Sequence, residues 1–135
     1  MGTVVDASFL ASVMLPDEVS DASTAKLERL AEQRVTAPAL LQIEITNLLV
    51  MAERRKRITE GECRRLSAAI DALPIVIQPP LTALERASVL HLSRGHELTA
   101  YDASYLELAL RLGLDLATHD EKLKKAAASA GVAVV

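Results

Sequence analysis

Four carboxylate side chains lie in apolar surroundings at wide intervals along this 135-residue chain: Asp6 in VVDAS, Glu44 in LLQIEITNLL, Asp102 in LTAYDASYLELAL and Asp120 in LATHDEKL. Burying one polar group without a partner costs on the order of 2–7 kcal/mol, and an isolated charge costs more. Each acid therefore needs hydrogen-bonding partners or a cation. Oxygen ligands without His or Cys partners select hard ions such as Mg²⁺ or Mn²⁺, and such ions serve phosphoryl chemistry.

Three of these acids also have a simpler interpretation as helix caps. An Asp at the start of a helix accepts hydrogen bonds from the free amides of the first turn. Asp6 and Asp120 each precede a helical stretch, and Thr99 and Asp102 have the spacing of a capping box. For these three acids, the roles of cap and metal ligand both stay open.

Glu44 cannot be a cap, because it lies in the second turn of a predicted helix. It shares a helix face with apolar residues and therefore points at the edge of the core. Asn47 lies one turn further on, where its amide can bond a carboxylate oxygen or a bound water. The alternative is a buried ion pair, for which Arg34 and Arg54 are the nearest basic residues in sequence. We interpret Glu44 as functional and as the most diagnostic of the four acids.

The elements that must position these acids follow from the hydrophobic pattern. Short apolar runs alternate with longer amphipathic stretches, and the runs do not alternate in polarity, which indicates a parallel sheet covered on both faces. We expect strands at 4–5, 35–37, 75–77, 114–118 and 132–135, and helices at 7–15, 20–34, 39–56, 59–73, 81–94, 101–112 and 120–130. The predicted fold is one α/β domain over residues 1–135, a three-layer sandwich with a short parallel central sheet. Ligands of such sheets bind beyond the carboxyl ends of the strands, where all four acids can face one another.

Composition narrows the class of protein further. The net charge is −3, which argues against a protein held on nucleic acid by bulk electrostatics, although not against a nuclease that grips a short strand locally. With one Phe, two Tyr and no Trp, an aromatic stacking platform is excluded. Cys63 is the only cysteine, so neither an intrachain disulfide nor a cysteine zinc site is available. We find no apolar stretch of roughly 18 residues and no signal peptide, and we expect a cytoplasmic protein.

Two groups of basic residues need an interpretation. The first is Arg54, Arg55 and Arg57 with Lys56, which ends a predicted helix, where cations favour the negative end of the helix dipole. A solvated helix end is the simpler interpretation, and contact with an RNA backbone is the alternative. The second group is the solvated face of the last helix, with the same alternative: Lys122, Lys124 and Lys125. His119 adjoins Asp120, and we interpret it as a bystander.

Taken in order, these segments resemble a known family. The chain is similar to the PIN-domain proteins, and specifically to the VapC-type toxin ribonucleases of type II toxin–antitoxin pairs. The resemblance covers essentially the full length and rests on VVDAS, the E-x-x-N-x-L segment from Glu44, YDASYLELA and LATHDEKL. Each segment alone is weak, whereas their order and spacing in a chain of this size are specific.

The resemblance implies a Mg²⁺-dependent endoribonuclease, with Mn²⁺ as a substitute. It assigns the metal to Asp6, Asp102 and Asp120, and gives Glu44 the role of holding the metal or orienting the attacking water. Residues beside the acids would bond them or the scissile phosphate, namely Ser8, Asn47 and Thr118. The implied partners are the RNA substrate, a second copy in a homodimer, and a VapB-type antitoxin that forms a hetero-oligomer and places a side chain, often Arg, in the acidic pocket.

Three other functions were weighed. A signalling receiver domain needs adjacent acids after its first strand and an Asp after its third, and the segment 75–80 contains no acid. A phosphatase of the D-x-D type fails at Ser8, and the isolated glycines form no phosphate loop. A catalytically silent PIN-like module that acts through a protein partner remains the alternative, against which the four intact acids argue.

Overall fold

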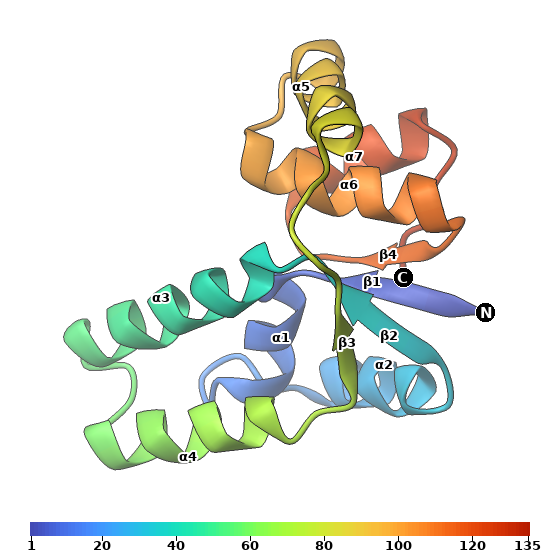
Figure 1. Ribbon diagram of the computed structural model, residues 1–135. Coiled ribbons are helices and arrows are strands. Elements are labelled where there is room, and N and C mark those ends of the chain that lie inside the picture. Colours follow the sequence, from blue (N-terminus) through green and yellow to red (C-terminus); the bar gives the residue numbers. More distant parts are fainter.

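In the computed structural model, which describes residues 1–135, a four-stranded parallel sheet runs through the molecule in the order β3-β2-β1-β4 (Figure 1). Its strands are β1 (Gly2–Val5), β2 (Arg34–Ala37), β3 (Ile75–Ile77) and β4 (Asp115–Ala117). The helices are α1 (Ala7–Met14), α2 (Asp21–Ala31), α3 (Leu40–Arg54), α4 (Glu60–Asp71), α5 (Ala83–His96), α6 (Ala100–Leu112) and α7 (Glu121–Ser129). The predicted three-layer α/β sandwich is confirmed, with α5, α6 and α7 on one side of the sheet and α1 to α4 on the other.

The central strand β1 holds the two halves of the core together. All four of its residues are buried, which explains why its sequence does not alternate in polarity. Successive side chains of a strand point to opposite faces. Accordingly, Val4 packs with Leu106 of α6 and Leu123 of α7, whereas Val5 packs with Phe9 of α1 on the other face.

The ends of the predicted elements agree with the structure to within about two residues in most cases. The predicted helix 20–34 is wrong at its end, because α2 stops at Ala31 and Arg34 already begins β2. A capping box of Thr59 and Glu62 begins α4, and Gly113 in the left-handed conformation ends α6.

The predicted fifth strand at 132–135 is wrong. This segment forms only an isolated bridge between Val134 and Leu116. Both of its backbone bonds use Leu116, which donates to Ala133 and accepts from Val135, each at 2.9 Å. One residue of the short β4 therefore carries the whole contact, and no ladder forms.

The longest helix, α3, has 15 residues, and none of the helices has both the length and the apolar character to cross a membrane.

Candidate active site

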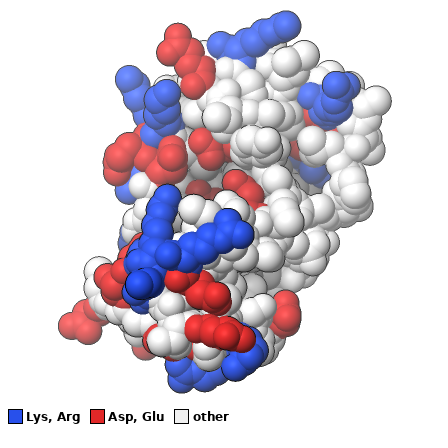
Figure 2. Space-filling model, turned by 90° about the vertical axis from the view of Figure 1, so that its left-hand side faces the viewer, with Lys and Arg blue, Asp and Glu red and all other residues white.

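Three of the four acids lie at the starts of helices α1, α6 and α7, and Glu44 lies in the second turn of α3. The carboxyl end of the sheet is on the left of Figure 1. α1 follows β1 directly, α3 follows β2 and α7 follows β4, so the parallel strands deliver three helix starts to one edge. Figure 2 shows this face, with acidic side chains in a hollow between the upper and lower parts of the molecule and a group of Lys and Arg side chains below it.

Asp6 is buried at the end of β1 and is held by three hydrogen bonds. Its Oδ1 accepts from the Phe9 amide at 2.9 Å, which caps α1, and from the Ser8 hydroxyl at 2.7 Å. Its Oδ2 accepts from the Thr118 hydroxyl. Burial raises the pKa of Asp6, and these three bonds oppose that rise. Asp6 therefore caps a helix and is at the same time fixed in one orientation.

Ser8 and Thr118 tie the end of β1 to the end of β4. The Ser8 hydroxyl accepts from the His119 amide at 2.9 Å, and the Thr118 hydroxyl accepts from the Asp120 amide at 3.1 Å. Asp120 in turn caps α7, where it accepts from the Leu123 amide at 2.8 Å. The two hydroxyls that the sequence placed beside the acids thus set the positions of both Asp6 and Asp120.

Asp102 is the acid that the fold itself uses least. Thr99 caps α6 and accepts from the Asp102 amide at 3.2 Å, but the Asp102 carboxylate makes no return bond to the Thr99 amide, so the predicted capping box is only half formed. This return bond is present at the starts of α2, α4 and α5, where it is made by Ser23, Glu62 and Glu85. The Asp102 carboxylate is half-buried, and the Thr99 hydroxyl lowers its pKa.

Glu44 of α3 is held by a residue that the sequence interpretation missed. The hydroxyl of Tyr105, on α6, donates to Oε1 of Glu44 at 2.5 Å. Tyr105 is only 1% exposed, and burial together with this bond raises the pKa of its hydroxyl far above the usual range. Neither Arg34 nor Arg54 pairs with Glu44, so the alternative of a buried ion pair is not realised. The available signal was that a buried Tyr needs a partner for its hydroxyl.

The four acids share one electrostatic environment. Burial raises the pKa of Asp102 most, and repulsion from Asp120, Glu44 and Asp6 raises it further. None of the ion pairs of the protein involves any of these four acids. A cluster of like charges without a neutralising partner, gathered at the edge of a parallel sheet, is typical of a functional site rather than of a structural one.

The donors of this cluster are oxygens, which suits a hard divalent ion. No three His, Cys, Asp or Glu side chains of the protein approach closely enough to form a ready set of ligands. Mg²⁺ usually binds through one or two carboxylates and retains several waters, so such an arrangement fits it better than a Ca²⁺ cage or a zinc site.

Comparisons with known proteins identify the family of the chain. The family model for the PIN domain matches residues 3–129. Ribonuclease VapC3 of Mycobacterium tuberculosis is 37% identical over 129 residues, which cover 94% of this chain and 88% of the relative. The chain belongs to the PIN-domain family and, within it, to the VapC-type ribonucleases.

Other relatives support the same assignment. Ribonuclease VapC1 of Mycobacterium tuberculosis is 35% identical over 97 residues, which cover 72% of this chain and 71% of the relative. A crystal structure from Pyrobaculum aerophilum has a TM-score of 0.72 and 26% identity, and the match covers all of this chain and 84% of that one. The VapBC2 structure from Rickettsia felis, at 13% identity, shares the fold with a TM-score of 0.70, over 100% of this chain and 98% of that one.

The basic cluster at the end of α3, beside the acids of this PIN domain, contains one arginine that is paired with acids and two that are not. Glu44, Asn47, Arg55 and Arg57 line one pocket of about 450 Å³. The guanidinium of Arg57, however, is bound to Asp17 at 2.8 Å and to a second acid, Glu18, at 2.7 Å. Its charge is thus used within the protein, whereas Arg54 and Arg55 have no acidic partner.

His119 lies against α1 rather than in the acidic hollow. Its ring stacks on Phe9 with 6.2 Å between the ring centres, and its Nε2 lies 3.0 Å from the Ser12 hydroxyl. The ring is therefore occupied by packing, in keeping with the interpretation of His119 as a bystander.

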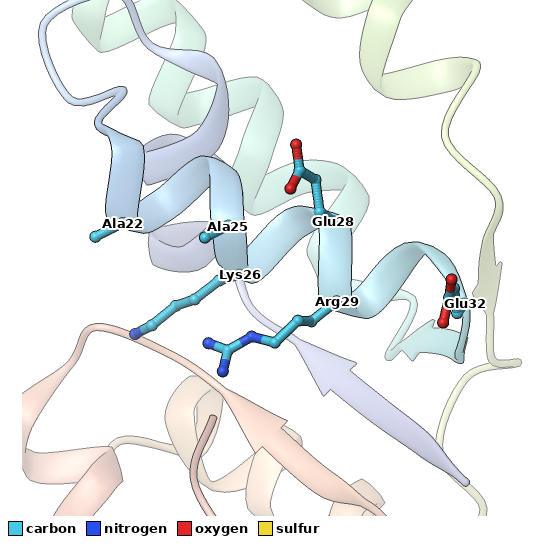
Figure 3. A pocket seen from close by; sticks show the side chains of 6 residues that line it. All are labelled: Ala22, Ala25, Lys26, Glu28, Arg29 and Glu32. Carbon is cyan, nitrogen blue, oxygen red and sulfur yellow. The ribbon is translucent and has the colours of Figure 1, made fainter.

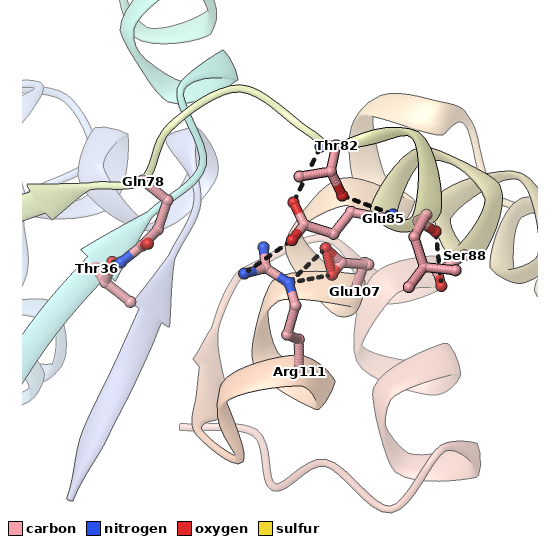
Figure 4. A network of polar contacts seen from close by, with 8 residues as sticks. Thr36, Gln78, Thr82, Glu85, Ser88, Glu107 and Arg111 are labelled. Atoms are coloured by element: carbon pink, nitrogen blue, oxygen red, sulfur yellow. Dashed lines mark hydrogen bonds and ion pairs between the residues drawn. The ribbon is translucent and has the colours of Figure 1, made fainter.

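A second network of charges fastens α5 to α6 (Figure 4). The guanidinium of Arg111 bonds the buried carboxylate of Glu107 at 2.9 Å and lies 3.6 Å from Glu85. Glu107 is only 3% exposed, so it depends on Arg111 for its charge. The network supports α6, which carries both Asp102 and Tyr105. The i,i+4 spacing of Glu107 and Arg111 was the sequence signal that could have found this pair.

Proposed function

We propose that this PIN domain is the toxin of a toxin–antitoxin pair and cleaves RNA as a Mg²⁺-dependent endoribonuclease. The observation that carries the proposal is the carboxylate of Asp102, which is repelled by three other acids and forms no ion pair within the chain. The hydroxyl of Thr99 lowers its pKa, but burial and the neighbouring acids raise it more. Membership of the VapC-type ribonucleases supplies the reaction class.

In this proposal Asp6, Asp102 and Asp120 hold the ion, directly or through water. When bound, Mg²⁺ polarises the scissile phosphate and lowers the pKa of a bound water, and Mn²⁺ can substitute for it. Asp6 is pre-oriented by its bonds to Ser8, Thr118 and the Phe9 amide, so little reorganisation is needed when the ion arrives.

Glu44 orients the attacking water and accepts its proton. Tyr105 occupies Oε1 of Glu44, which leaves Oε2 for the water. Asn47 lies one turn further along α3 in the same pocket, where its amide can bond the water or a phosphate oxygen. Ser8 and Thr118 act by holding Asp6, and Arg54 and Arg55 are the remaining candidates at the end of α3 for contact with the RNA backbone.

The proposed protein partner is a VapB-type antitoxin. The structures of FitAB and of VapBC2, each bound to a DNA fragment, share this fold at 17% and 13% identity and support a two-protein assembly. A group of four acids that forms no ion pair within the chain suits an inserted Arg from such a partner. We also propose a homodimer, which light scattering on the isolated protein tests directly.

The proposal is tested by inducing the chain in cells and mapping new RNA 5′ ends by sequencing. Wild type should produce ends at a small set of sites that are absent when Asp102→Asn is induced at the same level. Growth arrest without new ends, or equal growth arrest by both forms, would favour the alternative of a catalytically silent binding module that acts through a protein partner.

A further inference from the structure

A cationic cavity lies next to the acidic hollow, between the end of α5 and the outer face of α7. Its volume is about 370 Å³, and its lining includes the cations Arg94, Lys122 and Lys125, the acid Glu97 and the imidazole of His96. Only one of these side chains is an acid, in a protein whose net charge is −3. The cavity therefore gathers positive charge in a protein whose net charge is negative.

The cations of this cavity have no partners within the chain. Arg94, Lys122 and Lys125 take part in none of the ion pairs of the protein. The neighbouring Lys124, on another face of α7, pairs with Glu121 at 3.4 Å. The helix thus neutralises the lysine outside the cavity and leaves the two inside it free.

The helix dipole separates these cations into two kinds. Arg94 lies in the last turn of α5, where positive charge is favoured, so helix stability alone can explain it. Lys122 lies in the first turn of α7, where a cation is disfavoured. Lys125 lies three residues on, on the same face. Helix stability does not explain these two lysines, which points to a ligand.

The cavity adjoins the acids along the chain at two places. Asp120 caps α7, so at 1.5 Å per residue Lys125 lies about 7–8 Å from it along the helix axis. On the other side, Glu97 leads through Leu98 into the first turn of α6, which carries Asp102. A polyanion that crosses the acidic hollow therefore meets this cavity next.

We propose that the cavity binds backbone phosphates of single-stranded RNA beside the cleavage point, with Lys122 and Lys125 as the contacts. This inference rests on the proposed function. Four clustered acids repel RNA, and a fixed positive site next to them supplies the attraction that they lack. The contacts are to phosphate, so they set the position of the strand without reading its sequence.

The test compares two double variants. Lys122→Ala/Lys125→Ala removes the proposed contacts, and both lysines are exposed, so folding is retained. The matched control, Lys26→Ala/Arg29→Ala, removes the same charge from a shallow surface groove along α2 (Figure 3). There the two cations alternate with Glu28 and Glu32, on the far side of the molecule from the acids.

Binding of a fluorescent single-stranded RNA is measured by anisotropy over a series of KCl concentrations in EDTA, where no cleavage occurs. The slope of log K against log salt should fall by about 1.4 in the lysine variant, because each phosphate contact on a single strand contributes about 0.7. Its affinity at about 0.1 M salt should fall about tenfold. In cleavage assays, KM should rise with kcat unchanged. The control variant should match wild type in all four quantities.

Equal salt slopes for the lysine variant and the control would overturn the phosphate site. An equal loss of RNA affinity in the two variants would overturn it as well. Failure of the proposed function looks different: wild type would bind RNA and the lysine variant would lose that binding, yet wild type would leave RNA intact with Mg²⁺ present. That result would support the phosphate site and refute the nuclease.

Discussion

Replacing Tyr105 with Phe removes a single hydrogen bond from the site and little else. The ring of Tyr105 is buried, and Phe fills the same volume, so core packing is preserved. The lost bond is the one from its hydroxyl to Glu44 at 2.5 Å. A hydrogen bond to a charged group contributes about 1.5–3 kcal/mol to stability. Because Glu44 is half-buried, water partly replaces the lost bond.

We therefore expect Tyr105→Phe to lower the free energy of unfolding by about 1–2 kcal/mol. For a chain of this length that corresponds to a fall in Tm of about 4–7 °C. If Glu44 orients the attacking water, its loss of restraint should lower kcat about tenfold, with KM nearly unchanged. Urea denaturation gives the stability, and steady-state cleavage of a labelled RNA gives the two kinetic constants.

Tyr101→Phe is the matched control, because Tyr101 lies one turn earlier on α6, is 61% exposed and bonds no other side chain. It should leave stability and kinetics unchanged. A double-mutant cycle of Tyr105→Phe with Glu44→Gln should show coupling of about 1 kcal/mol or more. Additive effects of the two substitutions, or a kcat for Tyr105→Phe equal to that of wild type, would refute the assignment of Tyr105 as the residue that positions Glu44.

Two further predictions concern charge. Asp102→Asn should abolish cleavage and yet raise the stability of the metal-free protein, because it relieves repulsion from Asp120 and the other acids. The folded-state pKa of Asp102 lies above its ordinary value of 3.8, so wild type loses stability as pH rises through that pKa. The advantage of Asn in thermal melts should therefore vanish below about pH 4, and an advantage that persists there would contradict this cause. Arg111→Met leaves the carboxylate of Glu107 buried and unpaired, which should cost about 2–3 kcal/mol in urea denaturation. Arg64→Met, in a pair whose two side chains are 74% exposed, should cost less than about 0.5 kcal/mol, and similar losses for both variants would argue against burial as the reason.

The sequence predicted the architecture because the strands are short apolar runs bounded by clear helix signals. Thr59 with Glu62 and Gly113 marked helix ends through local backbone chemistry, which does not depend on the rest of the fold. Asp6 and Asp120 were found for the same reason, since each directly follows a strand and caps the next helix.

The remaining features depend on contacts between distant segments. The bond from Tyr105 to Glu44 spans 61 residues, and that from Arg57 to Asp17 spans 40, so no local pattern shows either of them. The roles of cap and ligand stayed open for Asp102, because spacing alone does not show whether the return bond of a capping box forms. The last residues were apolar enough for a strand, but only Leu116 was available for pairing.

The most direct test of the central claim is a cleavage assay on purified protein and total RNA, with Mg²⁺ titrated from zero in wild type and in Asp102→Asn. The four acids should make cleavage by wild type rise with Mg²⁺ and disappear in EDTA, while Asp102→Asn stays inactive at every Mg²⁺ concentration. Cleavage by wild type that persists in EDTA, or cleavage by Asp102→Asn at the wild-type rate, would contradict a metal site built on these acids.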